Sequence, residues 1–294
     1  MGSPGKFVLL SAIWGSSFAL IKVALDAGVP PVQVALARCL FGAVALWAVC
    51  AAQGASVPRD RRTWGHAAVV ALLLNSVPFT LLAFGESKVD SVLAGVLNAT
   101  TPLTTLAFAL LVVPGEKVTR TRLAGLLLGF AGVLVLLGVW RGLDGDLLAG
   151  GLACLAATTC YGAGFAYTRR FFSGGPHRAS ALSAVQITCA TVQLGLVAPV
   201  ISGPPAWPGA HAFLALLVLG AAGTGYAYVL NLDLIREAGA TVAATVTYVT
   251  PLWSTALGAL LLAEPVGWNT FAGGAVVIGG ILLARRPSAD KVTT

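Results

Sequence analysis

Residues 97–116, LNATTPLTTLAFALLVVPGE, form an apolar segment of helix length with an Asn, several Thr residues and a proline near its middle. A second copy lies at residues 248–264, YVTPLWSTALGALLLAE, and its Thr-Pro pair aligns with the first one. A proline inside a helix frees a backbone carbonyl, which a neighbour or a bound molecule must then satisfy. Two such helices, one in each half of the chain, predict a binding site between the halves.

The composition identifies the class of protein. Hydrophobic residues make up 57% of the chain and charged residues 10%, and the mean hydropathy is +0.87. Soluble domains carry about 25% charged residues, so the sequence indicates a polytopic membrane protein. The five cysteines lie in apolar segments without a CxxC motif, which argues against a disulfide framework or a metal site.

The apolar segments predict an all-α protein with ten transmembrane helices, because each has about the 20 residues needed to cross a bilayer. The first is taken as a span and not as a signal peptide, since no cleavage site follows it. The predicted spans are 7–25, 31–52, 63–85, 90–112, 122–140, 146–168, 177–200, 210–235, 240–262 and 268–284.

The two halves of the chain repeat each other. Residues 14–19, WGSSFA, match 161–166, YGAGFA, and 124–132 match 272–280, at offsets between 147 and 149 residues. The duplication divides the chain into a first repeat, 1–142, and a second, 143–294. Five spans per repeat is an odd number, so the second repeat enters the membrane from the opposite side, as an inverted repeat.

The basic residues predict the orientation. With the N-terminus inside, 14 of the 18 Lys and Arg residues fall in inside segments, so both termini are expected in the cytoplasm. The net charge of +7 is therefore interpreted as a topology signal. Basic residues interleaved with aromatic ones are missing, and we expect no nucleic-acid partner.

Polar and aromatic residues inside the spans are the candidates for binding. An Asn amide needs a partner outside its own helix, whereas a Thr hydroxyl can bond to its own backbone. Deep aromatic side chains either pack or stack on a substrate. The candidate substrate-binding residues are Trp14, Asn75, Pro78, Asn98, Thr101, Tyr161, Tyr228 and Tyr248. The candidate kink or gating residues are Pro78, Pro102, Gly223, Gly225 and Pro251.

Few charges lie inside the spans. Arg38 is alone in its span, so it should face protein or water; it either holds interhelical carbonyls or binds a carboxylate. No Asp or Glu falls clearly at the middle of a span, so the sequence does not indicate proton coupling. Gly125 and Gly129 form a GxxxG motif that we expect to pack within the chain, in a protein that functions as a monomer.

The chain resembles EamA-type transporters of the drug/metabolite transporter superfamily. The resemblance rests on the ten-span duplication, the WGxxFA motif, Arg38 and the TP…GE pattern that ends at Glu116. Size and aromatic placement are most similar to the YddG-type exporters of aromatic amino acids. The second repeat departs from the pattern, with Tyr161 for Trp, Gln186 near the place of Arg38 and Ala before Glu264. The two halves are therefore not interchangeable.

This resemblance implies a secondary transporter of the inner membrane. We expect it to export small metabolites, aromatic or neutral amino acids above all, by alternating access through a central cavity. Its partners would be the small-molecule substrate and the lipid bilayer, without a cofactor, metal or catalytic residue. The alternatives are an exporter of another metabolite or drug class, a membrane channel and a lipid-handling protein. No HExxH or GxSxG motif supports an enzyme.

Overall fold

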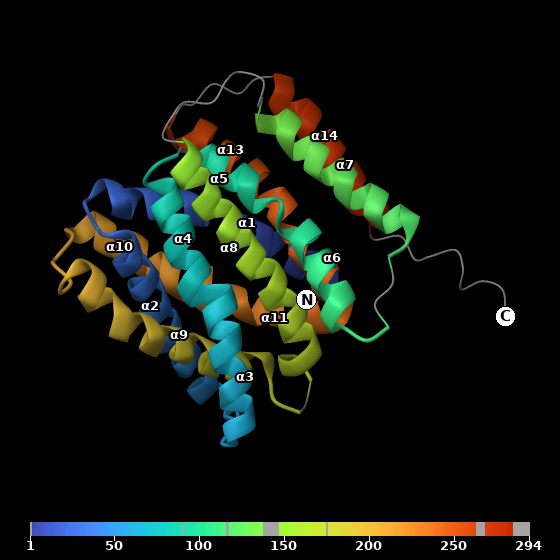
Figure 1. The fold of residues 1–294 in the computed structure, drawn as a ribbon. Coiled ribbons are helices and arrows are strands. Elements are labelled where there is room, and N and C mark those ends of the chain that lie inside the picture. Colours follow the sequence, from blue (N-terminus) through green and yellow to red (C-terminus); the bar gives the residue numbers. More distant parts are fainter. Residues whose placement is uncertain are drawn as a thin grey trace.

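The computed structural model describes residues 2–89, 91–115, 118–137, 147–174, 176–262 and 268–284 (Figure 1). Every regular element in these ranges is helical, as predicted; η marks a π-helical turn. Up to residue 137 the elements are α1 (Ser3–Asp26), α2 (Pro31–Ala52), α3 (Arg61–Ala71), η1 (Leu72–Ser76), α4 (Val77–Glu86), α5 (Ser91–Asn98), α6 (Thr101–Val112) and α7 (Arg120–Leu137). From residue 147 they are α8 (Leu147–Tyr167), η3 (Thr168–Phe172), α9 (Ala179–Ser202), α10 (Ala210–Gly220), η4 (Ala221–Tyr226), α11 (Ala227–Ala238), α12 (Ala240–Ala244), α13 (Val246–Leu262) and α14 (Trp268–Ala284).

Six helical runs in the described ranges are long and apolar enough to cross a membrane, which supports a multi-pass membrane protein. They are Ser3–Asp26, Pro31–Ala52, Arg61–Glu86, Leu148–Phe172, Ala179–Ser202 and Ala210–Ala238. Thr101–Val112 and Phe271–Ala284 are shorter apolar helices. The ten-span count and the division at residue 142 stay predictions, and the residues around that division lie outside the described part of the chain.

Two long helical runs each contain a π-helical turn near the middle. The run from Arg61 to Glu86 contains η1, and the run from Ala210 to Ala238 contains η4. A π-helical turn widens the helix by one residue and is frequent at functional sites. Gly223 and Gly225, the predicted bending residues, both lie in η4, and Pro78 is the second residue after η1.

The repeated Thr-Pro pair has a structural explanation. In an α-helix each N–H bonds to the carbonyl four residues earlier, so Pro102 leaves the carbonyl of Asn98 free. The Thr101 hydroxyl donates to that carbonyl at 2.6 Å. In the second copy, the hydroxyl of Thr250 donates at 2.9 Å to the carbonyl that Pro251 frees, at residue 247. In both copies the threonine hydroxyl replaces the backbone N–H donor that the proline lacks.

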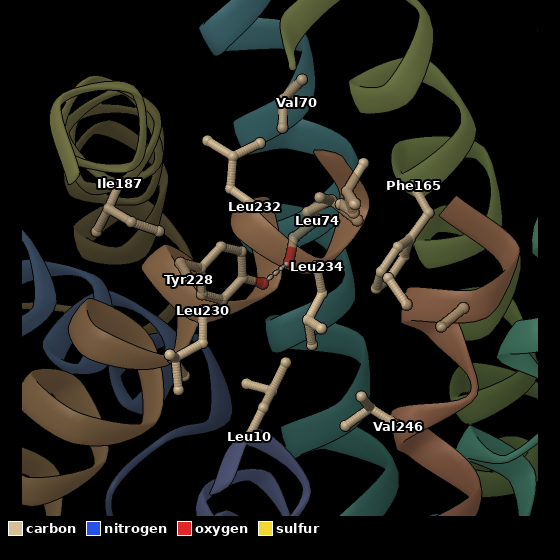
Figure 2. Packing of buried hydrophobic residues seen from close by; sticks show 14 of the residues in the cluster. Leu10, Val70, Leu74, Phe165, Ile187, Tyr228, Leu230, Leu232, Leu234 and Val246 are labelled. Atoms are coloured by element: carbon tan, nitrogen blue, oxygen red, sulfur yellow. Dashed lines mark hydrogen bonds between the residues drawn. The ribbon is translucent and has the colours of Figure 1, made fainter. Parts of the chain in front are cut away.

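Pro78 frees a carbonyl in the same way, and here the partner comes from another helix. Figure 2 shows the hydroxyl of Tyr228, on α11, donating to the Leu74 carbonyl at 2.7 Å. The interruption at Pro102 lies where the sequence predicts it, because α5 ends at Asn98 and α6 begins at Thr101. The predicted bend at Pro251 differs: Pro251 lies inside α13, and the interruption is at Thr245, between α12 and α13.

Helices α7 and α14 lie side by side along their length (Figure 1). A Cβ atom added to Gly125 would lie 2.8 Å from the Gly280 carbonyl oxygen, and one added to Gly132 would lie 2.6 Å from the Val277 nitrogen. Glycine therefore lets the two backbones approach closely. The prediction that the motif at Gly125 and Gly129 packs inside the chain is confirmed. Glu116 and Glu264, which the sequence places at span ends, lie outside the described residues.

Candidate functional site: a cavity between the two halves

A cavity lies between helices from both halves of the chain and contains about 540 Å³ of space not filled by protein atoms, any opening included. The lining residues are Trp14, Ser17, Phe18, Ile21, Arg38, Leu74, Phe79, Leu82, Asn98, Thr101, Tyr161, Phe165, Tyr228, Asn231 and Thr247. Most of them are apolar or aromatic, with a few polar groups among them.

Arg38 provides the positive charge of the cavity. Its Nε donates to the Thr224 hydroxyl at 3.1 Å, and its guanidinium carbon lies 3.7 Å from the centre of the Phe79 ring. Within the described ranges it forms no ion pair with a carboxylate, although it is only 4% exposed. The hydrogen bond and the aromatic face hold the guanidinium in place. No described carboxylate therefore lies within ion-pair distance of Arg38, and its charge can attract an anionic group in the cavity.

A second polar pair occupies the equivalent place in the other half. Gln186, on α9, donates from its amide nitrogen to Asn75 Oδ1 in η1 at 2.7 Å. Arg38 on α2 contacts Thr224 in η4 in the same way. The two pairs each join a long helix to a π-helical turn, and only one of them carries a charge. Because the second repeat has Gln186 where the first has Arg38, the charge around the cavity differs between the two halves.

Aromatic side chains form much of the wall. The Trp14 indole donates from Nε1 to the carbonyl of Gly223 at 3.2 Å. Its ring meets Tyr228 edge-on at 6.1 Å between centres, and Tyr228 meets Phe79 edge-on at 6.2 Å. These contacts fix the ring planes, because edge-to-face pairs of aromatic rings are favourable. The wall therefore offers aromatic surface to a flat apolar group.

Five of the eight predicted binding residues line the cavity: Trp14, Asn98, Thr101, Tyr161 and Tyr228. The hydroxyls of Thr101 and Tyr228 are already bonded to backbone carbonyls, so these two contribute mainly their apolar surface.

The other three do not line the cavity, which corrects their predicted position. Asn75 is fully buried against Gln186, and Pro78 is buried at the start of α4. Tyr248 is fully buried and donates its hydroxyl to the Leu126 carbonyl on α7 at 2.8 Å, which makes it a packing residue. Helical spacing predicts which residues share a face of one helix, but which face meets the cavity depends on how the helices pack.

Several lining residues were not among the predicted ones. Phe79 follows Pro78 on the helix face that also carries Asn75, and Phe165 belongs to the repeated YGAGFA motif, so each had a signal in the sequence although neither was chosen as a binding residue. Asn231 belongs to the polar stripe of its helix with Tyr228, and that stripe was the available signal. Its Oδ1 is buried and has no hydrogen-bond partner among the described residues. The residues that line the cavity therefore include an acceptor that no described residue satisfies, in addition to Arg38.

One end of the helix bundle is held by charged groups. The Lys6 ammonium of α1 lies 3.0 Å from Asp233 Oδ2 and 2.5 Å from Glu237 Oε1, both on α11. Arg236 donates to the carbonyls of Ser173 and His177, at 2.8 and 3.0 Å. These contacts link α1 and α11 to the segment after η3. At the other end of α1, Lys22 and Asp26 form an ion pair at 3.4 Å, but it is exposed and joins no second helix.

The profile of the EamA-like transporter family matches residues 6–138 and again 148–286. The chain belongs to the EamA-like transporter family. The inner membrane transporter YedA of Escherichia coli (strain K12) is 28% identical to this EamA-like chain over 98% of it and 94% of YedA. The aromatic amino acid exporter YddG of Ancylobacter novellus is 28% identical over 66% of this chain and 68% of YddG. A solved crystal structure that is 22% identical aligns with a TM-score of 0.76 over 96% of each chain, which shows the shared fold.

The family assignment confirms the resemblance read from the sequence, including its placement in the drug/metabolite transporter superfamily. It identifies a transporter of a cellular membrane, related to proteins named as transporters and not as enzymes.

Proposed function

We propose that this protein exports small metabolites that carry both a carboxylate and an aromatic or apolar group, with aromatic and neutral amino acids as the main substrates. The observation that carries this is the Arg38 guanidinium, which lines the cavity without a carboxylate partner in the described residues. A substrate carboxylate would supply the missing charge. The aromatic wall around Trp14 and Tyr161 would contact the substrate's ring.

The amino group of such a substrate also has a partner in the cavity. A buried acceptor without a partner costs free energy, about 1–3 kcal/mol, which a bound donor would recover. Asn231 Oδ1 is such an acceptor and lies on the same cavity as Arg38. The similarity to an aromatic amino acid exporter agrees with this substrate class.

The proposed topology is ten spans in two inverted repeats, with both termini in the cytoplasm. The family profile matches each half separately, which supports the duplication. The π-helical turn that starts at Leu72 has a counterpart that starts at Ala221, 149 residues later. An inverted repeat would place a substrate site at the interface of its halves, where this cavity lies.

Transport would proceed by alternating access. The charged contacts between Lys6 and α11 hold the end that the Lys and Arg distribution assigns to the cytoplasm. Breaking them would open that end. The helices that occupy the same places in the other repeat would then close the outer end. The π-helical turns and Gly223 and Gly225 are places where the helices can bend. The substrate biases the equilibrium by its different affinity for the two states.

Counterflow in proteoliposomes tests this proposal. Vesicles preloaded with unlabelled phenylalanine should take up labelled phenylalanine transiently and saturably. Phenethylamine, which lacks the carboxylate, should compete at least tenfold more weakly. Arg38→Gln should abolish the discrimination, whereas Arg178→Gln, a change at an exposed arginine, should leave it intact.

Other outcomes point to the alternatives. Uptake without counterflow or saturation would indicate a channel, and scrambling of labelled lipid without amino acid exchange would indicate a lipid-handling protein. Equal competition by phenethylamine and phenylalanine would refute the carboxylate site at Arg38. An exporter of another metabolite or drug class would show counterflow only with a different substrate.

A further inference from the structure

Glu86 is a buried carboxyl group that the transport site does not use. The sequence places it in the turn after the third predicted span, but in the structure it is the last residue of α4 and has no exposed surface. It lies one helical turn beyond Leu82, which lines the cavity. At this end of α4 the packing against α8 is close: a Cβ added to the neighbouring Gly85 would lie 3.2 Å from the Gly150 carbonyl oxygen.

Neither carboxyl oxygen of Glu86 has a hydrogen-bond partner among the described residues. The groups in electrostatic range from the surrounding helices are Lys22 on α1, Arg38 on α2, and Cys154 and Tyr161 on α8. Neither cation comes within 4.0 Å of a Glu86 oxygen, the limit for an ion pair.

An ionised carboxylate that is buried without a partner is unfavourable, so such a group takes up a proton instead. We propose that Glu86 is a proton-binding site that holds a proton in this state and releases it to water when its end of the cavity opens. The step is the dissociation of one O–H bond, with the proton passing to water and the charge remaining on the carboxylate.

Proton release would make the conformational equilibrium depend on pH. The proton-bound form stabilises the state with Glu86 buried, so this state should be favoured at low pH and lost as the pH rises. For one proton the equilibrium constant changes by up to about tenfold per pH unit. The coupling part of this inference rests on the proposed transport function, whereas the proton site itself does not.

Infrared spectroscopy of the reconstituted protein tests the proton site. The wild type at neutral pH should show the C=O stretching band of a protonated carboxylic acid, and Glu86→Gln should remove it. Asp26→Asn is the matched control, since Asp26 is also a carboxylate but is exposed, at the end of α1. A band that is unchanged in Glu86→Gln would overturn the proposal, whatever the transport result.

Counterflow at equal pH on both sides tests the coupling. The wild-type exchange rate should change by severalfold between pH 6 and pH 8, and Asp26→Asn should behave alike. Glu86→Gln, which mimics the protonated carboxyl, should exchange substrate at a rate that no longer varies with pH. A Glu86→Gln rate with the wild-type pH dependence would refute the coupling. If no variant shows counterflow at all, the transport function fails and the infrared result still decides the proton site.

Discussion

Replacing Gly280 by alanine should separate helices α7 and α14. A Cβ at this position would lie 2.6 Å from the Gly129 Cα and 2.7 Å from the Gly125 carbonyl oxygen, and these are backbone atoms that cannot rotate away. Ordinary contacts begin at about 3.4 Å, so the backbones would have to move apart by several tenths of an ångström or more. Overpacking of this kind costs about 1–3 kcal/mol.

The adjacent Gly279 provides a matched control, because a Cβ there meets no atom within 4 Å. Both substitutions gain the same helix propensity, about 1 kcal/mol, so the difference between them isolates the packing cost. In a thermal unfolding assay in detergent, Gly280→Ala should melt several degrees below Gly279→Ala, at about 2–4 °C per kcal/mol. Equal melting temperatures for the two variants would refute the close approach of these helices.

Three further changes test individual contacts. Thr101→Val should destabilise the protein by about 1–3 kcal/mol because it leaves a buried carbonyl unpaired, and Pro102→Ala in the same chain should recover part of this loss in unfolding measurements. Tyr248→Phe should lower the free energy of unfolding by about 1 kcal/mol, because a hydrogen bond is lost, and should leave the KM of transport unchanged. A raised KM would show that Tyr248 contributes to substrate binding. Lys6→Gln should speed alkylation of a cysteine introduced at Ser17, on the cavity wall, from the cytoplasmic side, because the ion pair of Lys6 with Asp233 is lost; an unchanged rate would argue against a gate there.

The helices and the repeat could be predicted from the sequence because their signals are local or periodic. Apolar length gives the spans, and the Thr-Pro pairs mark both copies of one element. The Thr-Pro pair also illustrates the limit of such reasoning. The carbonyl that Pro102 frees, at the end of α5, is satisfied by the hydroxyl of Thr101 at the start of α6, so at Pro102 the motif explains a helix break and not a substrate contact.

What could not be predicted depends on how the helices pack. Tyr248 and Tyr228 look alike in the sequence, yet one is buried against α7 and the other lines the cavity. Glu86 follows a predicted span and is interpreted as a turn residue, and it is buried because α4 packs against its neighbouring helices. The sequence left two roles for Arg38, holding interhelical carbonyls or binding a substrate carboxylate. Its lack of a carboxylate partner in the described structure favours the second role.

The central claim is that one cavity is reached alternately from the two sides of the membrane. Ser17→Cys, in a chain whose five native cysteines are replaced, places one thiol on the cavity wall. A membrane-impermeant thiol reagent should label it in both right-side-out and inside-out vesicles, and phenylalanine should slow the labelling in both. Labelling from only one side, with or without substrate, would contradict alternating access through this cavity.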